Sequence, residues 1–217
     1  MKNTFKTIKE PVIGEYTVKA SRFITYGFSV ESEEEWQKAL SEVKKAHPKA
    51  NHHCYAYRLG TDDNHYRAND DGEPSGTAGK PILGQLRSFG VTNTIVIVVR
   101  YFGGTLLGAS GLISAYKKAA AGALEQATII EKSVSDIYRL TFEYSIMTEV
   151  MNTVKRLKLT ILQKDLGTKG VMDIAIPQKD AKELMPQLKA GIAKVHLEMV
   201  EDMELIPGLE MEFLGSK

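Results

Sequence analysis

The sequence has a single cysteine, Cys54, among its 217 residues. One cysteine cannot form an intrachain disulfide, and it excludes every zinc site that needs two or more cysteine ligands. Long apolar runs are missing as well: the longest, Thr94 to Val99, is far shorter than the ~20 residues that a membrane-spanning helix needs. The first residues contain no apolar stretch of the kind that secretion signals have. These absences predict a cytoplasmic protein without membrane contact.

The sequence also has no excess of charge of either sign. Lys and Arg total 28 against 27 Asp and Glu, which leaves a formal net charge of +1. Non-specific binding along duplex DNA needs many cationic contacts to phosphate, so the composition argues against it, although a local basic groove stays compatible with these totals. The hydrophobic content of 43% is ordinary for a globular protein, and the length suits one large or two small domains.

The first 130 residues or so predict a unit of mixed strands and helices. Alternating residues predict strands over 15–20 and 22–30, and Ser32 followed by three glutamates is typical of a helix start. Further expected elements are strands over 51–59 and 65–68, a short helix from Pro81 to Gly90, a strand over 94–101 and a helix over 108–127. The strand over 94–101 is β-branched without alternation, which favours a central strand that is covered on both faces. The last helix is expected to bury Ala109, Leu112, Ile113, Tyr116, Ala120, Ala123 and Leu124.

From about residue 134 the pattern changes to strand, helix, strand, strand, helix, strand. These elements are expected over 134–144, 146–158, 159–166, 169–176, 180–190 and 195–200. The order βαββαβ is that of the ferredoxin-like fold. We therefore predict an α+β protein with two domains, over 1–132 and 133–205, and a poorly ordered tail over 206–217.

The segment from Asn69 to Gly79 is the most informative stretch of the chain. It holds three carboxylates (Asp70, Asp71 and Glu73), the hydroxyls of Ser75 and Thr77, and three glycines that include Gly76. A plain connection could be far shorter, and loops on a rigid scaffold often carry binding groups. Two interpretations remain open: a structural turn, for which Asp71-Gly72 is a hairpin signal, or a loop whose carboxylates act as acid and base or hold Mg²⁺.

A second polar cluster lies in the strand expected over 51–59. Strand alternation puts His52 and Cys54 on one face. The two residues suit a thiol–imidazole nucleophile, or a metal site completed by Asp70 or Asp71, or a structural or ligand-contacting role. A single cysteine is more often a small buried apolar residue, so we expect the last of these roles, with no catalytic residue and no metal.

A third cluster, Arg100-Tyr101-Phe102-Gly103-Gly104, ends the central strand and leads toward the helix that begins near Gly108. Strand ends and helix N-termini are favoured sites for anionic ligands. The glycine spacing matches neither the dinucleotide fingerprint nor the P-loop. A guanidinium at the end of an apolar strand usually pairs with a carboxylate or an anionic ligand, and the loop carboxylates are candidates for Arg100.

Together, three segments resemble the IMPACT family in its bacterial, YigZ-type form: His52-x-Cys54-x-Ala56-Tyr57, Asn69 through Gly79, and Arg100 through Leu112. The order and spacing of all three match, over roughly residues 15 to 125. The resemblance implies a first domain of the ribosomal-protein-S5 domain-2-like fold and a second domain similar to domain V of elongation factor G. It also implies an association with the regulation of translation, because eukaryotic members of the family have that role.

We therefore expect a non-enzymatic binding protein associated with translation, which uses a polar groove on its first domain. The partner would be RNA, the ribosome or a translation-related protein, with no cofactor. Arg100 and amides near Gly103 or Thr77 would hold phosphate, while Tyr101 would stack on a base. The expected ligand-binding residues are His52, Cys54, Asp70, Asp71, Glu73, Ser75, Gly76, Thr77, Arg100, Tyr101, Gly103 and Gly104. The alternative is a small-molecule enzyme, a phosphotransferase or hydrolase, that uses the acidic loop and the glycine-rich turn.

Overall fold

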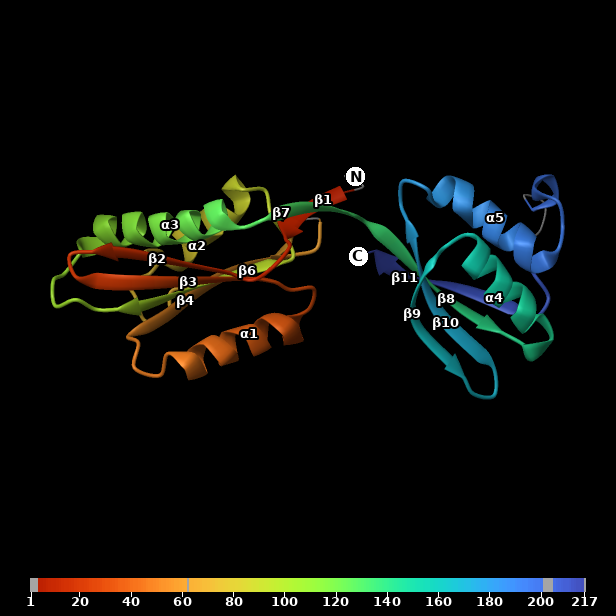
Figure 1. The fold of residues 1–217 in the computed structure, drawn as a ribbon, viewed down its shortest axis with the longest axis horizontal. Helices are drawn as coiled ribbons and strands as arrows, with labels where there is room; N and C mark the ends of the chain where they lie inside the picture. The colour runs from red at the N-terminus through yellow and green to blue at the C-terminus, as the bar shows by residue number, and fades with distance from the viewer. Residues whose placement is uncertain (1–3, 62, 201–204, 217) are drawn as a thin grey trace. The chain divides into compact units, whose positions relative to one another are not determined.

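The computed structural model describes residues 4–61, 63–200 and 205–216 (Figure 1). Contacts between residues divide the chain into two compact units, one over Phe5–Lys132 and the other made of Ser133–Lys217 together with Met1–Thr4. Both units combine helices with β-sheet, so the protein has the mixed α and β class that the sequence predicts. None of the helices in the described ranges is both long enough and apolar enough to cross a membrane.

The first unit is built on an antiparallel sheet of five strands in the order β2-β3-β6-β4-β5. The strands are β2 (Val12–Val18), β3 (Ser21–Ser29), β6 (Thr94–Tyr101), β4 (His52–Leu59) and β5 (His65–Asn69). The central strand β6 is buried from Thr94 to Arg100, which confirms the prediction from its β-branched run. A separate two-stranded sheet joins β1 (Thr4–Ile8) to β7 (Ile129–Ser133), and the sequence did not predict it.

Helices cover both faces of the five-stranded sheet (Figure 1). Helix α1 (Glu33–Ala46) covers one face, and α2 (Gly79–Ser88) and α3 (Gly108–Gln126) cover the other. The predicted start of α1 is confirmed, because the Ser32 side chain accepts a hydrogen bond from the Glu35 amide at 3.3 Å. Each helix therefore buries its own apolar face against the sheet.

The predicted apolar face of α3 was wrong at two positions. Ala109 is exposed because it lies in the first turn, outside the buried part of the helix, and Ile113 is 43% exposed. Ile113 lies about 100° around the helix axis from Leu112, which is buried. The buried stripe instead includes Ala115 and Ala119, whose small side chains let the helix backbone approach the sheet.

The second unit has a four-stranded antiparallel sheet in the order β11-β8-β10-β9. In chain order its elements are β8 (Ser135–Phe142), α4 (Met147–Arg156), β9 (Thr160–Leu166), β10 (Gly170–Pro177), α5 (Ala181–Ala193) and β11 (Leu209–Ser216). Side chains of both helices join strand residues such as Leu140 and Met172 in one apolar cluster. Short 3₁₀ helices follow β8 (η1, Tyr144–Ile146) and α5 (η2, Leu197–Met199).

The end of the chain differs from the sequence prediction. The strand expected over 195–200 was wrong, because the amides of Met199 and Val200 bond to carbonyls three residues earlier and form η2. Residues 209–216, expected to be part of a tail, form β11 and pair along β8. Leu209 is buried in the second core, and this burial holds the strand in place. Residues 201–204 and 217, also within the expected tail or just before it, lie outside the described residues.

Candidate functional site

Asp70 ties the Asn69–Gly79 loop to the start of α2. Its carboxylate accepts hydrogen bonds from the amides of Gly76 at 2.8 Å, Ala78 at 2.9 Å and Gly79 at 2.8 Å. The amides of Ala78 and Gly79 lie at the start of α2, the positive end of the helix dipole. Burial raises the pKa of Asp70, but the three amide bonds and nearby Lys80 outweigh burial and hold the pKa below its ordinary value. The loop's own amides therefore occupy this carboxylate.

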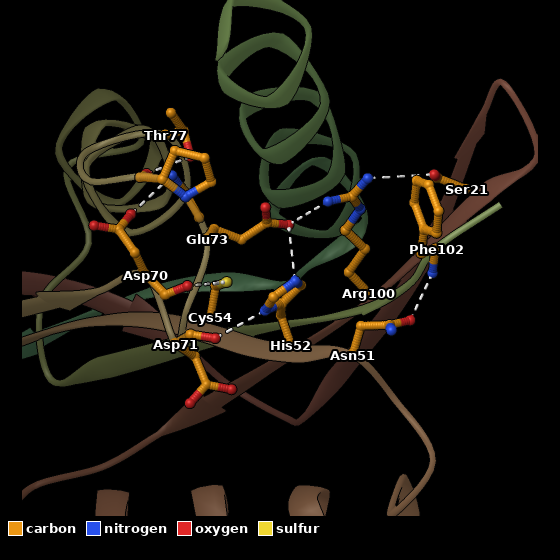
Figure 2. A network of polar contacts seen from close by, with 12 residues as sticks. Ser21, Asn51, His52, Cys54, Asp70, Asp71, Glu73, Thr77, Arg100 and Phe102 are labelled. Carbon is orange, nitrogen blue, oxygen red and sulfur yellow. Dashed lines mark hydrogen bonds and ion pairs between the residues drawn. The ribbon is translucent and has the colours of Figure 1, made fainter. Parts of the chain in front are cut away.

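Glu73 points from the same loop into the protein, where it meets Arg100 from β6 (Figure 2). It also meets Tyr116 from α3. Arg100 Nη1 donates to Glu73 Oε1 at 2.6 Å, and the Tyr116 hydroxyl donates to the same oxygen at 2.8 Å. The side chains of Glu73 and Arg100 are only 3% and 6% exposed. Burial raises the pKa of Tyr116, so its hydroxyl stays protonated and donates. The predicted pairing of Arg100 with a loop carboxylate is present in the structure, and Glu73 is the partner.

Cys54 lies beneath this cluster on β4 (Figure 2). Its sulfur is 3.0 Å from the Asp70 carbonyl oxygen and 3.3 Å from the Tyr116 hydroxyl. Burial raises the pKa of the thiol strongly; the Tyr116 hydrogen bond lowers it in part, while the nearby carboxylates, Glu73 foremost, raise it further. A thiol that stays protonated and enclosed is a poor nucleophile.

His52 lies on the same face of β4 as Cys54, as strand alternation predicted. Its Nδ1 donates to the Asp71 carbonyl oxygen at 2.8 Å, because that oxygen can only accept. The other ring nitrogen, Nε2, faces Glu73 Oε1 at 3.8 Å. His52 therefore joins the exposed part of the loop to the buried carboxylate.

Tyr101 and Thr77 differ from the prediction that they share one binding surface with the other residues. Tyr101 lies on the opposite face of the sheet, where its hydroxyl bonds to His47 Nδ1 at 2.9 Å, because neighbouring side chains on a strand point to opposite faces. Thr77 uses both its amide and its hydroxyl as donors to the Pro74 carbonyl, at 3.0 and 2.6 Å. The Thr77 amide was expected to hold phosphate, and the loop itself uses it instead.

The remaining predicted residues lie toward the surface. Ser75 is exposed, and Gly76 is half-buried with a positive φ of 75°. The Asp71 carboxylate accepts from the His53 amide at 2.6 Å and lies 3.6 Å from Lys44 Nζ. Gly104 is exposed with open space around its Cα.

Gly103 is a glycine for steric reasons. A methyl group at this position would collide with the backbone of Ala20 and Ser21. Its amide donates to Ser21 Oγ at 3.2 Å, so this donor, too, is used within the protein. Ser21 Oγ also lies 3.5 Å from Arg100 Nη2. The turn after β6 is therefore held against the start of β3.

Sequence reasoning did not identify Tyr116 or Ser21 as members of the cluster. It included Asn51 and Phe102 in the segments it singled out but gave them no role in the site. Tyr116 was assigned only to the apolar face of α3, although a fully buried tyrosine usually needs a hydrogen-bond partner for its hydroxyl. Asn51 Oδ1 accepts from the Phe102 amide at 2.8 Å and fixes the strand end. The Arg100 guanidinium carbon lies 5.5 Å from the centre of the Phe102 ring and 5.6 Å from that of Phe23.

One donor of the cluster is left over. Arg100 Nε is buried and has no hydrogen-bond partner among the described residues. Within the same part of the chain, no group of three or more His, Cys, Asp or Glu side chains is placed to hold a metal ion. The arrangement is a charge-balanced support for a polar loop, of which Gly72, Pro74 and Ser75 are exposed.

The chain is similar to several known proteins. A model of the Impact N-terminal domain matches residues 19–124. The IMPACT family member YvyE of Bacillus subtilis (strain 168) is 33% identical over 194 residues, which cover 88% of this chain and 89% of that protein. The IMPACT family member YigZ of Escherichia coli (strain K12) is 36% identical over 180 residues, which cover 82% and 88%. A crystal structure described as that of an hypothetical protein aligns with a TM-score of 0.78 at 31% identity, covering 97% of both chains.

Proposed function

This chain belongs to the IMPACT family, and on that premise we propose that it is a non-enzymatic binding protein that acts in the regulation of translation. Its contact is RNA of the ribosome, made through the exposed side of the Asn69–Gly79 loop. In this proposal the first unit is an S5 domain-2-like domain and the second a ferredoxin-like domain, with the boundary near residue 132. The protein then works in the cytoplasm, where translation takes place.

The observation that carries the proposal is the buried pair of Glu73 and Arg100. Burying two charges requires their removal from water, and such a pair contributes little net stability compared with well-packed apolar side chains. What the pair does achieve is to fix Glu73, and with it the loop, against β6 and α3. A loop held rigid before binding loses less conformational entropy when its partner arrives. Rigid presentation of a polar surface loop is what a binding protein needs.

Lys80 gives the loop a cationic side chain at the surface. It lies in the first turn of α2, where the helix dipole disfavours a positive charge, and that turn contains no acidic residue. Its side chain lies beside Gly76. Nearby Asp70 offsets part of the unfavourable charge, but folding of the helix alone does not call for a lysine here. Contact with a phosphate would account for it.

The enzyme alternative has less support from the same residues. The Asp70 carboxylate is used by three backbone amides, Glu73 is paired with Arg100, and the raised pKa of Cys54 keeps its thiol protonated. An acid, a base and a nucleophile all need a group that is free to react. His52 Nε2 faces the Glu73 carboxylate at 3.8 Å, too far for a hydrogen bond.

The test is co-sedimentation of the purified protein with ribosomes at stepped salt concentrations, for the wild type, Lys80→Gln and Lys38→Gln. Lys38 is the matched control, because it is an exposed lysine on α1, the helix that covers the opposite face of the sheet. We expect wild-type binding to weaken steadily with salt, and Lys80→Gln to reduce the slope of that dependence by about one phosphate contact. Lys38→Gln should behave like the wild type.

Three results would redirect the proposal. Binding that Lys80→Gln and Lys38→Gln weaken equally would place the contact away from the loop. No sedimentation at any salt concentration, together with turnover of a nucleotide in the presence of Mg²⁺, would favour the enzyme alternative. Capture of one translation-related protein in place of ribosomes would favour a protein partner for the same loop.

A further inference from the structure

The two faces of the five-stranded sheet are covered unequally (Figure 1). Helices α2 and α3 cover one face, whereas α1 alone covers the other, where it lies over β3 and β6. Strands spaced ~4.8 Å apart make a five-stranded sheet about two helix diameters wide, since a helix with its side chains is about 10 Å across. The face under α1 therefore has room for one more helix, over β4 and β5.

A groove runs along the side of α1 that faces this uncovered part of the sheet. It has a volume of about 620 Å³ and is lined by Trp36 and Leu40 of α1 and by Tyr55 of β4. Further lining residues follow one another at intervals of three or four, along one stripe of the helix and just beyond its end: Gln37, Ser41, Lys44 and Pro48. Between residues 36 and 45 the groove extends about 14 Å, at 1.5 Å per residue. An elongated groove beside a helix suits a second helix better than a compact small molecule.

The aromatic rings of the groove are already packed against one another. Trp36 stacks on Tyr55, with ring centres 5.6 Å apart, and on Tyr57, with ring centres 4.8 Å apart. Each of these three residues is only 6 or 7% exposed. A nucleic-acid base needs an exposed ring face to stack on, and these rings offer little of one. The groove therefore favours aliphatic side chains, which pack against Leu40 and the ring surface that remains.

Cations border the groove where α1 ends. Lys44 and Lys45 line it there. Arg67 of β5 is exposed and pairs directly with Tyr57 in the sheet, so it lies on the same face. Asp71 lies 3.6 Å from Lys44 and offsets part of its charge, whereas Lys45 forms no ion pair with a residue of the described ranges. Because the cations come from both the helix and the sheet, this end of the groove favours an acidic occupant.

The opposite end of α1 has the opposite charge. Its first turn carries the three glutamates at 33–35, which would repel a continuous chain of phosphates along the groove. A peptide does not have a charge at every position, so it can place carboxylates beside Lys45 and neutral side chains beside the glutamates. The charge pattern of the groove therefore favours a peptide over RNA.

We propose that this groove binds an amphipathic, acidic α-helix of a partner protein, which lies beside α1 over β4 and β5. The apolar side chains of that helix pack against Leu40 and the rings of Trp36 and Tyr55. Its carboxylates face Lys45 and Arg67. Lys80, on which the proposed ribosome contact depends, is not part of the groove, so ribosome binding and helix binding can fail separately.

The experiment uses Trp36, the single tryptophan of the chain, whose fluorescence reports binding in the groove. The full-length protein is titrated with synthetic peptides of about 14 residues, which span the groove as a helix. The first peptide has leucine at every third or fourth position and glutamate or alanine at the others. The second has lysine in place of glutamate, and the third has the composition of the first in an order without an apolar face. We expect saturable binding and a shift of the Trp36 emission with the first peptide alone.

Substitutions at Ser41 test the charge of the groove. Ser41 is exposed and lines the groove, and glutamate and lysine are both good helix formers at such a position. Ser41→Glu should weaken binding of the acidic peptide about fivefold, and Ser41→Lys should strengthen it by a similar factor. A loss of structure would move both variants in the same direction.

A pair of lysine variants places the contact on one face of the sheet. Lys45→Glu should weaken binding of the acidic peptide. Lys117→Glu is the matched control, because Lys117 is an exposed lysine of α3, which covers the opposite face, and this variant should bind like the wild type.

The proposal would be overturned by any of three results: no saturable binding of the acidic peptide, equal binding of the peptide without an apolar face, or equal affinities in Ser41→Glu and Ser41→Lys. A single-stranded RNA of about 12 nucleotides is titrated as well. RNA that shifts the Trp36 emission and displaces the peptide would assign the groove to nucleic acid and overturn the choice of a helix.

Discussion

Arg100 combines two properties that rarely occur together on one residue: a permanent charge and a position in the centre of a sheet. The five residues before it on β6, from Ile95 to Val99, are apolar and fully buried, yet the guanidinium is tolerated because Glu73 arrives from a distant loop. The loop sequence and the strand sequence therefore depend on one another. A change at either residue leaves the other as an uncompensated charge in a low-dielectric site.

Arg100→Ala is expected to destabilise the first unit strongly. Removal of one member of a buried pair typically costs roughly 3–5 kcal/mol, because the remaining carboxylate of Glu73 stays buried without its cation. Urea denaturation followed by circular dichroism measures this loss. The control is Arg22→Ala, which breaks an exposed two-pronged pair with Glu15 and should change the free energy of unfolding far less. Equal losses in the two variants would contradict the burial argument.

Cys54 predicts a dependence of stability on alkaline pH. Burial raises the pKa of the native thiol, whereas an unfolded thiol ionises near pH ~8.5. Below that pH the Cys54 thiol is protonated in both the native and the unfolded state, and its contribution to stability is fully present. Above it, the unfolded state releases a proton that the native state keeps, so the free energy of unfolding falls by up to about 1.4 kcal/mol per pH unit.

The measurement compares urea denaturation of the wild type and Cys54→Ala at pH 7.5, 8.5 and 9.5. The difference between the two proteins isolates the thiol, because all other ionising groups are shared. The wild type should lose its advantage over Cys54→Ala as the pH rises. A difference that stays constant over this range would show that the native thiol ionises as readily as the unfolded one.

Helices and strands differ in how well their own residues predict them. The start of α1 was predictable because Ser32 and the three glutamates act within one turn, and β6 was predictable because its lack of alternation reports cover on both faces. The strand expected over 195–200 was wrong although Val195, Leu197 and Met199 alternate with polar residues. The segment forms local backbone bonds between residues three apart, which the side-chain pattern does not reveal. The pattern of Leu209, Met211 and Phe213 did alternate, but Pro207-Gly208 before it was taken for the start of a tail.

The candidate site was predictable in part: the kind of pairing could be predicted, but the residue that forms the pair could not. Pairing of Arg100 with a loop carboxylate followed from the chemistry of a guanidinium at a strand end. The choice of Glu73 over Asp70 and Asp71 depends on the turn of the loop, which places the Asp70 carboxylate on three amides and leaves Glu73 pointing inward. Adjacent residues of a strand face opposite ways, so alternation alone would have separated Tyr101 from Arg100.

Strand β11 is expected to be essential to the second unit. It pairs with β8 along most of its length, and Leu209 belongs to the apolar core. Removal of residues 209–217 therefore exposes one edge of β8 and part of the core to water. We expect the truncated protein to lose the cooperative unfolding of its second unit and to be cut rapidly by protease within residues 134–200. Protease resistance equal to that of the full chain would show that β11 is dispensable.

At the scale of the whole molecule, the two units have separate sources of stability. The apolar clusters on the two faces of the five-stranded sheet are built from residues of the first unit, and the cluster beneath α4 and α5 is built entirely from residues of the second.

This division predicts that the chain can be cut into two proteins. The cut belongs between Ser133, the last residue of β7, and Val134, just before β8. Val134 stays in the second part because it is buried and its carbonyl accepts a hydrogen bond from the Gln178 amide. Fragments 1–133 and 134–217 should each unfold cooperatively on heating, and their two transitions should reproduce those of the full chain. The second fragment, with 84 residues in that range, should be the less stable, because a smaller domain buries a smaller fraction of its surface. Loss of a cooperative transition in either fragment, measured by circular dichroism, would show that its core is completed by the other unit.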